Sequence, residues 1–293
     1  NTLGRDASLI NESGRNGGGL VLESIIEIEI GDTGSEEENK TPLWSWHLSD
    51  HLTTDQSNIE KIWINYYDAG DKEDIFHANA LDYNSERKEL MLNVRGYHEF
   101  WVIKYDQGGS DDGKIVYRWG NPTTYKSGYQ VNTPTEWRIL DGQHNSHWIK
   151  TGERRGQIMT FDNDQYAQKE SEVRVIIPIY NDDGTYKKNS DGVYYPTVPE
   201  FSVKLPAEIG SWFISGAQDT GSGTILACNG PYGTFTEYDL AKNLVWKYVS
   251  PFVGGPNIAD QGTVPTFRSN MVFRALKYSV FESIFQTSDL LNE

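Results

Sequence analysis

Residues 76–122, "FHANALDYNSERKELMLNVRGYHEFWVIKYDQGGSDDGKIVYRWGNP", decide the fold of this chain. Apolar and β-branched runs alternate there with "YNSERK", "GYH" and "DQGGSDDG", which have the composition of turns. In the last run Ile115, Tyr117 and Trp119 fall on one face, because side chains of a strand alternate with a period of two. The segment therefore predicts four consecutive strands, at 76–82, 89–95, 99–105 and 114–119.

The same order of strands and turns recurs along the chain. Residues 143–205 form a longer copy that begins with "QHNSHWI", and residues 212–251 form a copy with "GTILAC", "GTFTEYD" and "LVWKYVSP". Only the back half of a copy is visible at the start ("ESIIEIEI", "PLWSWHLSD"), and only a first strand near the end ("SNMVFRALKYS"). Four-strand units that repeat in this way predict an all-β chain with the β-propeller fold, whereas a β-sandwich would not repeat one inner strand and turn order.

The predicted propeller covers residues 1–278 and contains about four blades, fewer than a closed ring of the six-bladed type. We expect the missing blades to precede residue 20 in a longer chain or to come from another polypeptide. Residues 52–74 are expected to be an excursion between blades. The tail, 279–293, is expected to form a short helix, because its apolar residues have helical spacing: Val280, Phe281, Ile284 and Phe285.

Composition excludes some partners. The chain has 293 residues and a formal net charge of -16, with 42 acidic and 26 basic residues. A nucleic-acid partner is disfavoured because a phosphate backbone requires a basic face. No apolar run of the sequence is as long as a membrane span. The single cysteine, Cys228, excludes an intrachain disulfide, and we expect it to be a small buried apolar residue.

Two acidic, glycine-containing segments, "DQGGSDDG" and "NDDGTYKKNSDG", could bind calcium. Both lack the twelve-residue loop with a closing glutamate, so solvated turns between strands are the favoured interpretation. No metal site and no cofactor are therefore expected.

The first strand of each propeller blade lines the central channel. Alignment of the copies by their second strands gives four equivalent inner-strand residues: His77, His144, Ser215 and Arg274. The period of two then predicts that Asn79 points the same way as His77, and Ser146 the same way as His144.

Imidazole, amide and guanidinium groups around one channel favour an anion site. Arginine offers a fork of donors to a tetrahedral oxyanion, and histidine can act as base, acid or nucleophile near neutral pH. The alternative is that these groups bind only ordered water and backbone, and spacing alone does not choose between the two.

The sequence resembles the arylsulfotransferase family, which has six-bladed propellers, over about residues 5–278. The resemblance lies in the order and spacing of "HANALDYN", "LNVRGYHEFWVIKYD", "GKIVYRWGNP", "GQHNSHWI", "IMTFDN", "FISGAQ" and "VFRALKY". It is closest to a branch of large secreted or periplasmic proteins, which implies a location outside the cytoplasm. It also implies transfer of sulfate from an aryl sulfate ester to a phenol through a sulfated histidine.

The resemblance carries over to individual positions. His77 matches the histidine of the family's "H-x-N-x-[IL]-D-Y-N" motif, His144 that of its "QH" motif, and Arg274 the arginine of its final strand. Arg95 matches an "S-R" position and is expected to brace His77 or to reach the channel. The implied catalytic residues are His77 and His144, and the implied sulfate-binding residues are Asn79, Arg95, Ser146, Ser215 and Arg274.

One departure from the family pattern sets the competing hypotheses. The nucleophilic histidine of the family aligns with "CNGPYGTF" here, and the sequence has no histidine after His147. The first hypothesis is sulfuryl transfer with His77 or His144 as the replacement nucleophile, acting on a small aryl sulfate and a phenol. The second is a non-catalytic extracellular propeller used for binding or assembly. A metal-assisted propeller hydrolase is a third, but it needs an Asn/Asp/Glu cage that the histidine-containing inner strands fit poorly.

Overall fold

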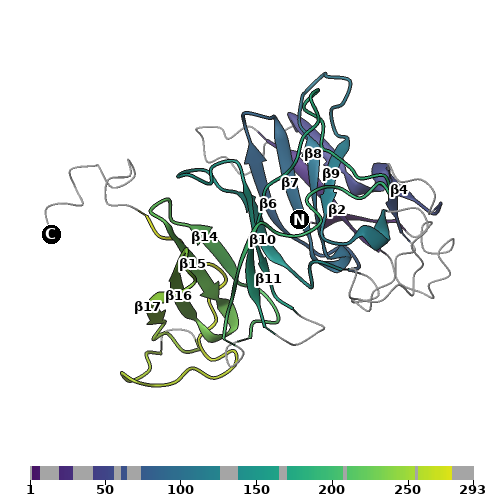
Figure 1. Ribbon diagram of the computed structural model, residues 1–293. Helices are drawn as coiled ribbons and strands as arrows, with labels where there is room; N and C mark the ends of the chain where they lie inside the picture. The colour runs from purple at the N-terminus through teal and green to yellow at the C-terminus, as the bar shows by residue number, and fades with distance from the viewer. Residues whose placement is uncertain are drawn as a thin grey trace, which may run out of the picture. The chain divides into compact units, whose positions relative to one another are not determined.

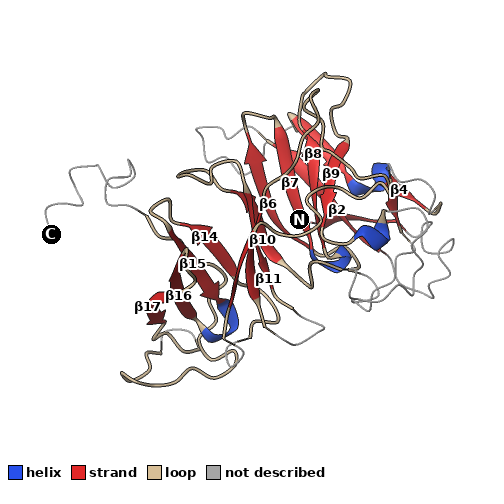
Figure 2. Cartoon of the chain, viewed as in Figure 1, coloured by secondary structure: helices blue, strands red, loops and turns tan. Residues whose placement is uncertain are grey.

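The computed structural model describes residues 2–6, 20–28, 42–55, 61–64, 74–125, 138–164, 170–206, 210–254 and 257–278. Strands make up most of the regular structure, and the helices are short 3-10 turns (Figure 2). The chain divides into two compact units. Unit 1 consists of Asn1–Ser146 and Pro178–Val198, and unit 2 of His147–Ile177 and Pro199–Glu293.

Unit 1 contains the blade predicted from residues 76–122 (Figure 1). Its strands are β6 (Ala78–Asn84), β7 (Glu89–Val94), β8 (Glu99–Lys104) and β9 (Ile115–Trp119), hydrogen-bonded in that order as an antiparallel sheet. The first turn closes because Asn84 Oδ1 accepts from the backbone N–H groups of Glu86 and Arg87. The predicted order and turns are confirmed.

A second sheet of unit 1 has three antiparallel strands, where the sequence predicted the back half of a copy. They are β1 (Thr2–Asp6), β2 (Leu20–Glu27) and β3 (Trp44–His47). The 3-10 turn η1 (Leu48–His51) follows. In the described part of the excursion, β4 (Leu52–Thr53) and β5 (Ile62–Trp63) form a short parallel pair.

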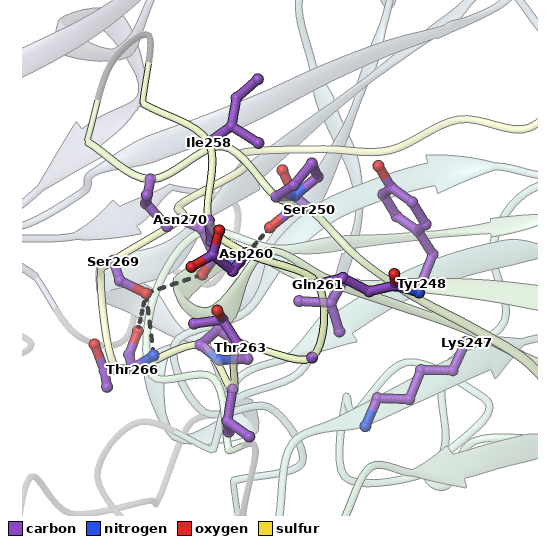
Figure 3. Close-up of a pocket in the computed structure, with 17 residues that line it drawn as sticks. Lys247, Tyr248, Ser250, Ile258, Asp260, Gln261, Thr263, Thr266, Ser269 and Asn270 are labelled. Atoms are coloured by element: carbon purple, nitrogen blue, oxygen red, sulfur yellow. Dashed lines mark hydrogen bonds between the residues drawn. The ribbon is translucent and has the colours of Figure 1, made fainter.

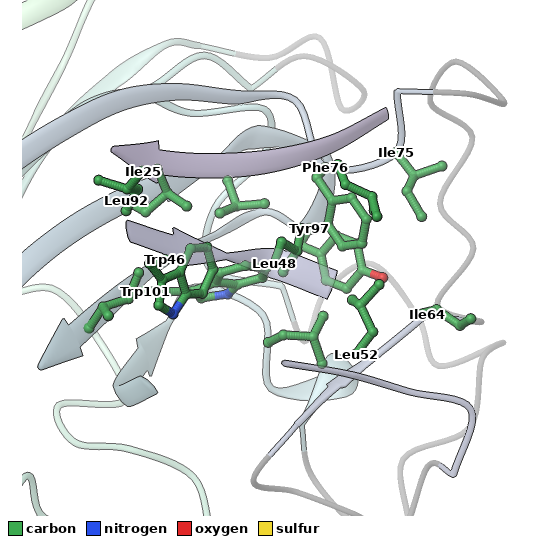
Figure 4. Close-up of a cluster of buried hydrophobic side chains, with 14 of the residues drawn as sticks. Ile25, Trp46, Leu48, Leu52, Ile64, Ile75, Phe76, Leu92, Tyr97 and Trp101 are labelled. Atoms are coloured by element: carbon green, nitrogen blue, oxygen red, sulfur yellow. The ribbon is translucent and has the colours of Figure 1, made fainter. Parts of the chain in front are cut away.

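The two sheets of unit 1 share one apolar core (Figure 4). Trp46 of β3 and Trp101 of β8 are both buried in it. Phe76 stacks on Tyr97 with ring centroids 5.0 Å apart, and the Tyr97 hydroxyl donates to the carbonyl of Trp63 at 2.9 Å. Large aromatic side chains thus join one sheet to the next, as packing between propeller blades requires.

Gly96 fixes the chain just before His77. It lies in the 3-10 turn η2 (Arg95–Tyr97), and its N–H donates to the carbonyl of Phe76 at 2.9 Å. A Cβ at this position would lie 1.9 Å from the carbonyl oxygen of Ile75. Only glycine therefore allows η2 to approach the backbone that leads into His77.

The residues Pro178–Val198, called the arm below, leave the sheet of unit 2 and pack on the β6–β9 blade. Tyr117 of β9 stacks on Tyr186 with centroids 4.4 Å apart, and its hydroxyl donates to the carbonyl of Tyr195 at 3.0 Å. The Tyr186 hydroxyl donates to Glu89 Oε2 at 2.7 Å. The arm is thus held by aromatic stacking and by buried hydrogen bonds together.

Two further four-stranded sheets follow the order of the chain. The first has β10 (His144–Trp148), β11 (Ile158–Asp162), β12 (Glu172–Ile176) and β13 (Phe201–Lys204). The second has β14 (Gly216–Asp219), β15 (Thr224–Asn229), β16 (Thr234–Asp239) and β17 (Leu244–Val249). Strand β10 starts in unit 1 and continues in unit 2.

Unit 2 has its own blade-on-blade core. Val173 and Val175 of β12 meet Ile225 and Ala227 of β15 in one buried cluster. The alternate residues of β15, Leu226 among them, face the other side of that sheet. The all-β, propeller-type fold is confirmed: the described residues form three four-stranded sheets, one three-stranded sheet and the β4–β5 pair.

The predicted C-terminal strand is wrong, because residues 271–278 contain no strand. Val272 donates its N–H to Gly230 in the 3-10 turn η6 (Gly230–Tyr232), and both backbone groups of Lys277 bond the side-chain amide of Gln218. These bonds do not form a ladder with another strand. The tail, 279–293, lies outside the described residues. Within the described part of the chain, no helix is long and apolar enough to cross a membrane.

Candidate functional site

His77 precedes its strand, so the prediction that it lies on the inner strand is wrong. Strand β6 begins at Ala78, and His77 has a left-handed φ of 49°. Asp74 holds this conformation: its Oδ1 accepts the His77 N–H at 3.1 Å, and its Oδ2 lies 2.6 Å from Nδ1 of the ring. The shared orientation of His77 and Asn79 therefore does not follow from strand alternation.

The contact with Asp74 defines the protonation of the ring. The hydrogen bond from His77 holds the pKa of the Asp74 carboxyl below its usual range, so the carboxylate is ionised at neutral pH and can only accept. Nδ1 must then carry the proton, and the lone pair of the neutral ring lies on Nε2. The His77 side chain is 41% exposed, so this imidazole is open to solvent.

Two more charged residues lie beside His77. The N–H of Arg95 donates to the His77 carbonyl at 3.3 Å, and the Arg95 charge also lowers the pKa of Asp74. Glu23 of β2 accepts the N–H of Ala78 at 2.9 Å. Burial raises the pKa of Glu23. The role expected for the Arg95 side chain, to brace His77 or to reach the channel, stays a prediction.

His144 is at the start of β10 and is only 4% exposed. Its Nδ1 lies 3.1 Å from the carbonyl oxygen of Gly142, which can only accept, so Nδ1 donates and Nε2 holds the lone pair. Asn145 has a left-handed φ of 57°. The prediction that His144 and Ser146 point the same way assumed extended backbone between them, and Asn145 removes that basis.

Asn79 and Ser146 meet in a buried amide network of unit 1. Asn93 of β7 donates to Asn79 Oδ1 at 2.5 Å and to the carbonyl of Gln143 at 2.9 Å. Its Oδ1 accepts from the Ser146 hydroxyl at 2.6 Å. Asn79 Nδ2 also donates to the Gln143 carbonyl, at 3.1 Å. The structure thus brings two predicted binding residues together, and their recorded hydrogen bonds tie β6 and β7 to β10.

Ser215, in unit 2, is fully buried and has a left-handed φ of 85°. Its Oγ lies 2.5 Å from the hydroxyl of Ser211 and accepts the N–H of Gly230 at 2.9 Å. These contacts join the start of β14 to η6. A role in binding sulfate stays a prediction.

Arg274, also in unit 2, lines a surface hollow of about 720 Å³. Phe235 and Trp246 supply aromatic walls, and Lys277 Nζ lies 2.8 Å from both carboxylate oxygens of Glu237. Burial alone would raise the pKa of Glu237, but the hydrogen bonds from Lys277 and Thr224 outweigh it and lower the pKa. The convergence of Arg274 with the histidines of unit 1 stays a prediction.

A larger hollow, of about 910 Å³, contains none of the predicted site residues. It lies between the end of β17 and the loop 250–270 (Figure 3). Ser269 Oγ donates to the carbonyl of Thr266 at 2.8 Å, and Asn270 Nδ2 donates to that of Ser250 at 2.8 Å. These polar groups stabilise the loop, and the hollow offers no histidine.

The acidic turns use their carboxylates within the protein. Asp112 accepts from Trp44 Nε1 at 3.0 Å and from the N–H of Asp106 at 2.9 Å, and Asp183 accepts from Thr185. Among the residues that the structure describes, no group of three His, Cys, Asp or Glu side chains could hold a metal ion. The expectation that these turns are solvated and hold no metal stays a prediction.

Sequence reasoning missed Asp74 and Asn93. A signal for Asn93 was present, since it is one polar residue in the otherwise apolar run "LMLNV". Asp74 lies three residues before His77, which is the spacing of a carboxylate that accepts a backbone N–H in a turn.

Comparisons with known proteins identify the family. Residues 16–248 match the family model described as Arylsulfotransferase (ASST). No curated protein matches the chain.

Several solved structures resemble it weakly. The β-propeller domain of Cps50 (Swd1) from Myceliophteria thermophila has 11% identity and a TM-score of 0.37, over 60% of this chain and 42% of that one. The WD40 domain of coronin from Toxoplasma gondii has 11% identity and a TM-score of 0.33, over 58% and 34%. The match with a Bacteroides caccae protein has 12% identity and a TM-score of 0.30, over 74% and 68%. The chain spans less than half the length of the first two.

Proposed function

Because this chain belongs to the arylsulfotransferase family, we propose that it transfers a sulfuryl group from an aryl sulfate ester to a phenolic acceptor. The family match over residues 16–248 carries this proposal. A solvent-open imidazole at His77 supports it, because the reaction needs a nucleophile that a substrate can reach, and the Arg95 charge acts on its hydrogen-bond partner Asp74. A location outside the cytoplasm is proposed with it, from the resemblance to secreted and periplasmic members.

The proposed reaction has two balanced steps. In the first, an imidazole nitrogen bonds to sulfur while the bond from sulfur to the aryl oxygen breaks and a phenolate leaves. In the second, the acceptor phenol attacks sulfur, the imidazole is released, and the phenol's proton passes through solvent to the phenolate. His77 and His144 are the candidate carriers, and Arg95 and Arg274 are candidates to neutralise the non-bridging oxygens.

The test is an assay of the full-length protein with p-nitrophenyl sulfate and excess phenol. We expect release of nitrophenolate that depends on phenol. The release should be lost when the histidine that carries the sulfuryl group is replaced, in His77→Ala or in His144→Ala, and circular dichroism checks that each variant is folded. His47→Ala is the matched control, because His47 bonds Ser24 on an exposed edge. Absence of release from folded wild-type protein with several phenols would contradict the proposal.

A second function, binding or assembly without catalysis, is favoured by the surface of the last sheet. Strand β17 exposes apolar residues, and the segment after it does the same. In a propeller each blade is covered on both faces, so we propose that a further blade, from a longer chain or another polypeptide, covers this surface. The exposed residues are Leu244, Val245, Trp246, Tyr248, Phe273 and Leu276.

Light scattering on the chain 1–293 tests the second function. If the surface binds a partner blade, we expect self-association that disappears in Trp246→Ser/Tyr248→Ser. A chain that stays monomeric at high concentration would contradict this idea.

A further inference from the structure

We propose that His77 is the sulfuryl acceptor of this chain and that Asp74 positions it. The inference rests on the sulfuryl transfer proposed above, but the pairing of the two residues can be tested without it. The proposal assigns a nucleophile to a chain that has no histidine at the position of the family's nucleophilic histidine. It also gives a role to Asp74.

The choice of His77 over His144 follows from access. A nucleophile must reach a sulfur atom on a substrate, and the His77 side chain is 41% exposed whereas His144 is 4% exposed. Among the described residues, the recorded polar contacts of the His77 ring run through Nδ1 to Asp74. Nε2 holds the lone pair and is therefore the ring atom that can attack sulfur.

Asp74 acts on His77 in two ways. Its two oxygens bond the backbone N–H and the ring Nδ1 of His77, at 3.1 and 2.6 Å, which fixes both the left-handed backbone and the tautomer. When Nε2 bonds to sulfur, the ring gains a positive charge as the phenolate leaves. The ionised carboxylate at Nδ1 stabilises that charge, as the carboxylate does in a Ser-His-Asp triad.

The neighbours of the pair keep the carboxylate ionised. The hydrogen bond from His77 lowers the pKa of Asp74, and the charge of Arg95 lowers it further. Glu23 Oε1 accepts the N–H of Ala78, and Nδ1 of the His77 ring bonds Asp74 Oδ2. Gly96 holds η2 against the residues that precede His77, which fixes the backbone on this side.

The first experiment labels the full-length protein with p-nitrophenyl [35S]sulfate in the absence of phenol, at alkaline pH. We expect a burst of one nitrophenolate per chain and label on the peptide that contains His77. Asp74→Asn should lower the burst rate about 100-fold, and Asp74→Glu should recover part of it. Asp111→Asn, in an exposed turn, is the matched control. Label on His144, or an unchanged burst in Asp74→Asn, would overturn the proposal.

The second experiment needs no turnover. Nitrogen-15 NMR of histidine-labelled protein should show the Nδ1–H tautomer for His77, and Asp74→Asn should shift its nitrogen resonances while leaving the resonances of His144 in place. If wild-type His77 shows the Nε2–H tautomer, the pairing is wrong even where sulfuryl transfer is active. If the tautomer is as expected but no nitrophenolate is released, the proposed reaction fails and so does the acceptor role, while the pairing stands.

Discussion

Asn93 and Ser146, 53 positions apart in the sequence, are joined by a hydrogen bond of 2.6 Å from the serine hydroxyl to the asparagine Oδ1. The bond connects β7 with β10 in the buried interior of unit 1. It belongs to a network in which Asn93 also donates to Asn79 and to the carbonyl of Gln143.

Replacement of Asn93 by alanine should therefore destabilise unit 1. The change leaves the carbonyl of Gln143, the amide oxygen of Asn79 and the hydroxyl of Ser146 each short of one hydrogen bond. We expect a loss of about 3 kcal/mol in the free energy of unfolding, measured by urea denaturation. Asn181→Ala, whose amide bonds Thr185 in an exposed turn, should cost less than 1 kcal/mol. Equal losses in the two variants would contradict the structural role of the network.

The buried pair of Glu99 and Arg118 should show strong coupling. Arg118 Nε and Nη2 lie 2.8 and 2.9 Å from the two oxygens of Glu99, and Trp101 Nε1 donates to the same carboxylate at 2.9 Å. Either Glu99→Ala or Arg118→Ala should cost about 3–5 kcal/mol, because each leaves a buried charge without its partner. The double variant should cost less than the sum of the single variants. An additive double-mutant cycle in urea unfolding would show that the pair does not act as a unit.

Cys228 is buried in β15, and burial raises the pKa of its thiol to about 12. The prediction of a small buried apolar residue is thus confirmed. Because the thiolate is the reactive form, the folded protein should not react with Ellman's reagent at pH 8, whereas protein in guanidinium chloride should release one equivalent of chromophore. A full reaction within minutes in the absence of denaturant would contradict this assignment.

The stability of unit 1 should depend on pH through Asp74. The pKa of this carboxyl is lower in the folded protein than in the unfolded chain. Its contribution is therefore present above the unfolded value, about 3.9, and is lost as the pH falls through the folded value. The Asp74 side chain is 31% exposed, so we expect the difference between wild type and Asp74→Asn to be about 1 kcal/mol or less at pH 6. In urea unfolding this difference should shrink at pH 3 and in high salt. A difference that grows at low pH would contradict the sign.

The blades could be predicted from the sequence because their signal is local. Apolar alternation and turn residues placed the four strands of residues 76–122, and the structure has β6–β9 in that order. A single strand-like segment, with no turn and partner strand predicted beside it, could not be assigned from this signal. Residues 271–278 have strand composition, but their hydrogen bonds go to η6 and to Gln218, and the sequence does not show which groups accept them.

The candidate site could be predicted only in part. Motif spacing located His77, but the left-handed backbone at His77 and at Asn145 could not be predicted, because neither residue type requires a positive φ. The orientation of His77 depends on its bond to Asp74, and Asp74 lies before the first residue of β6, outside the alternating pattern of the strand. Prediction from a period of two fails wherever the chain leaves the extended region beside the residue of interest.

The arm has a consequence for how this protein can be divided. Because Pro178–Val198 belongs to unit 1 while the residues on either side belong to unit 2, the polypeptide passes between the units three times, after Ser146, after Ile177 and after Val198. A single protease cut at one of these crossings leaves the units tethered by the other two. No contiguous gene fragment contains one unit whole without part of the other, because His147–Ile177 lies between the two parts of unit 1 and Pro178–Val198 lies between the two parts of unit 2. Excision of the second unit would require a circularly permuted gene or a short bridge in place of the arm.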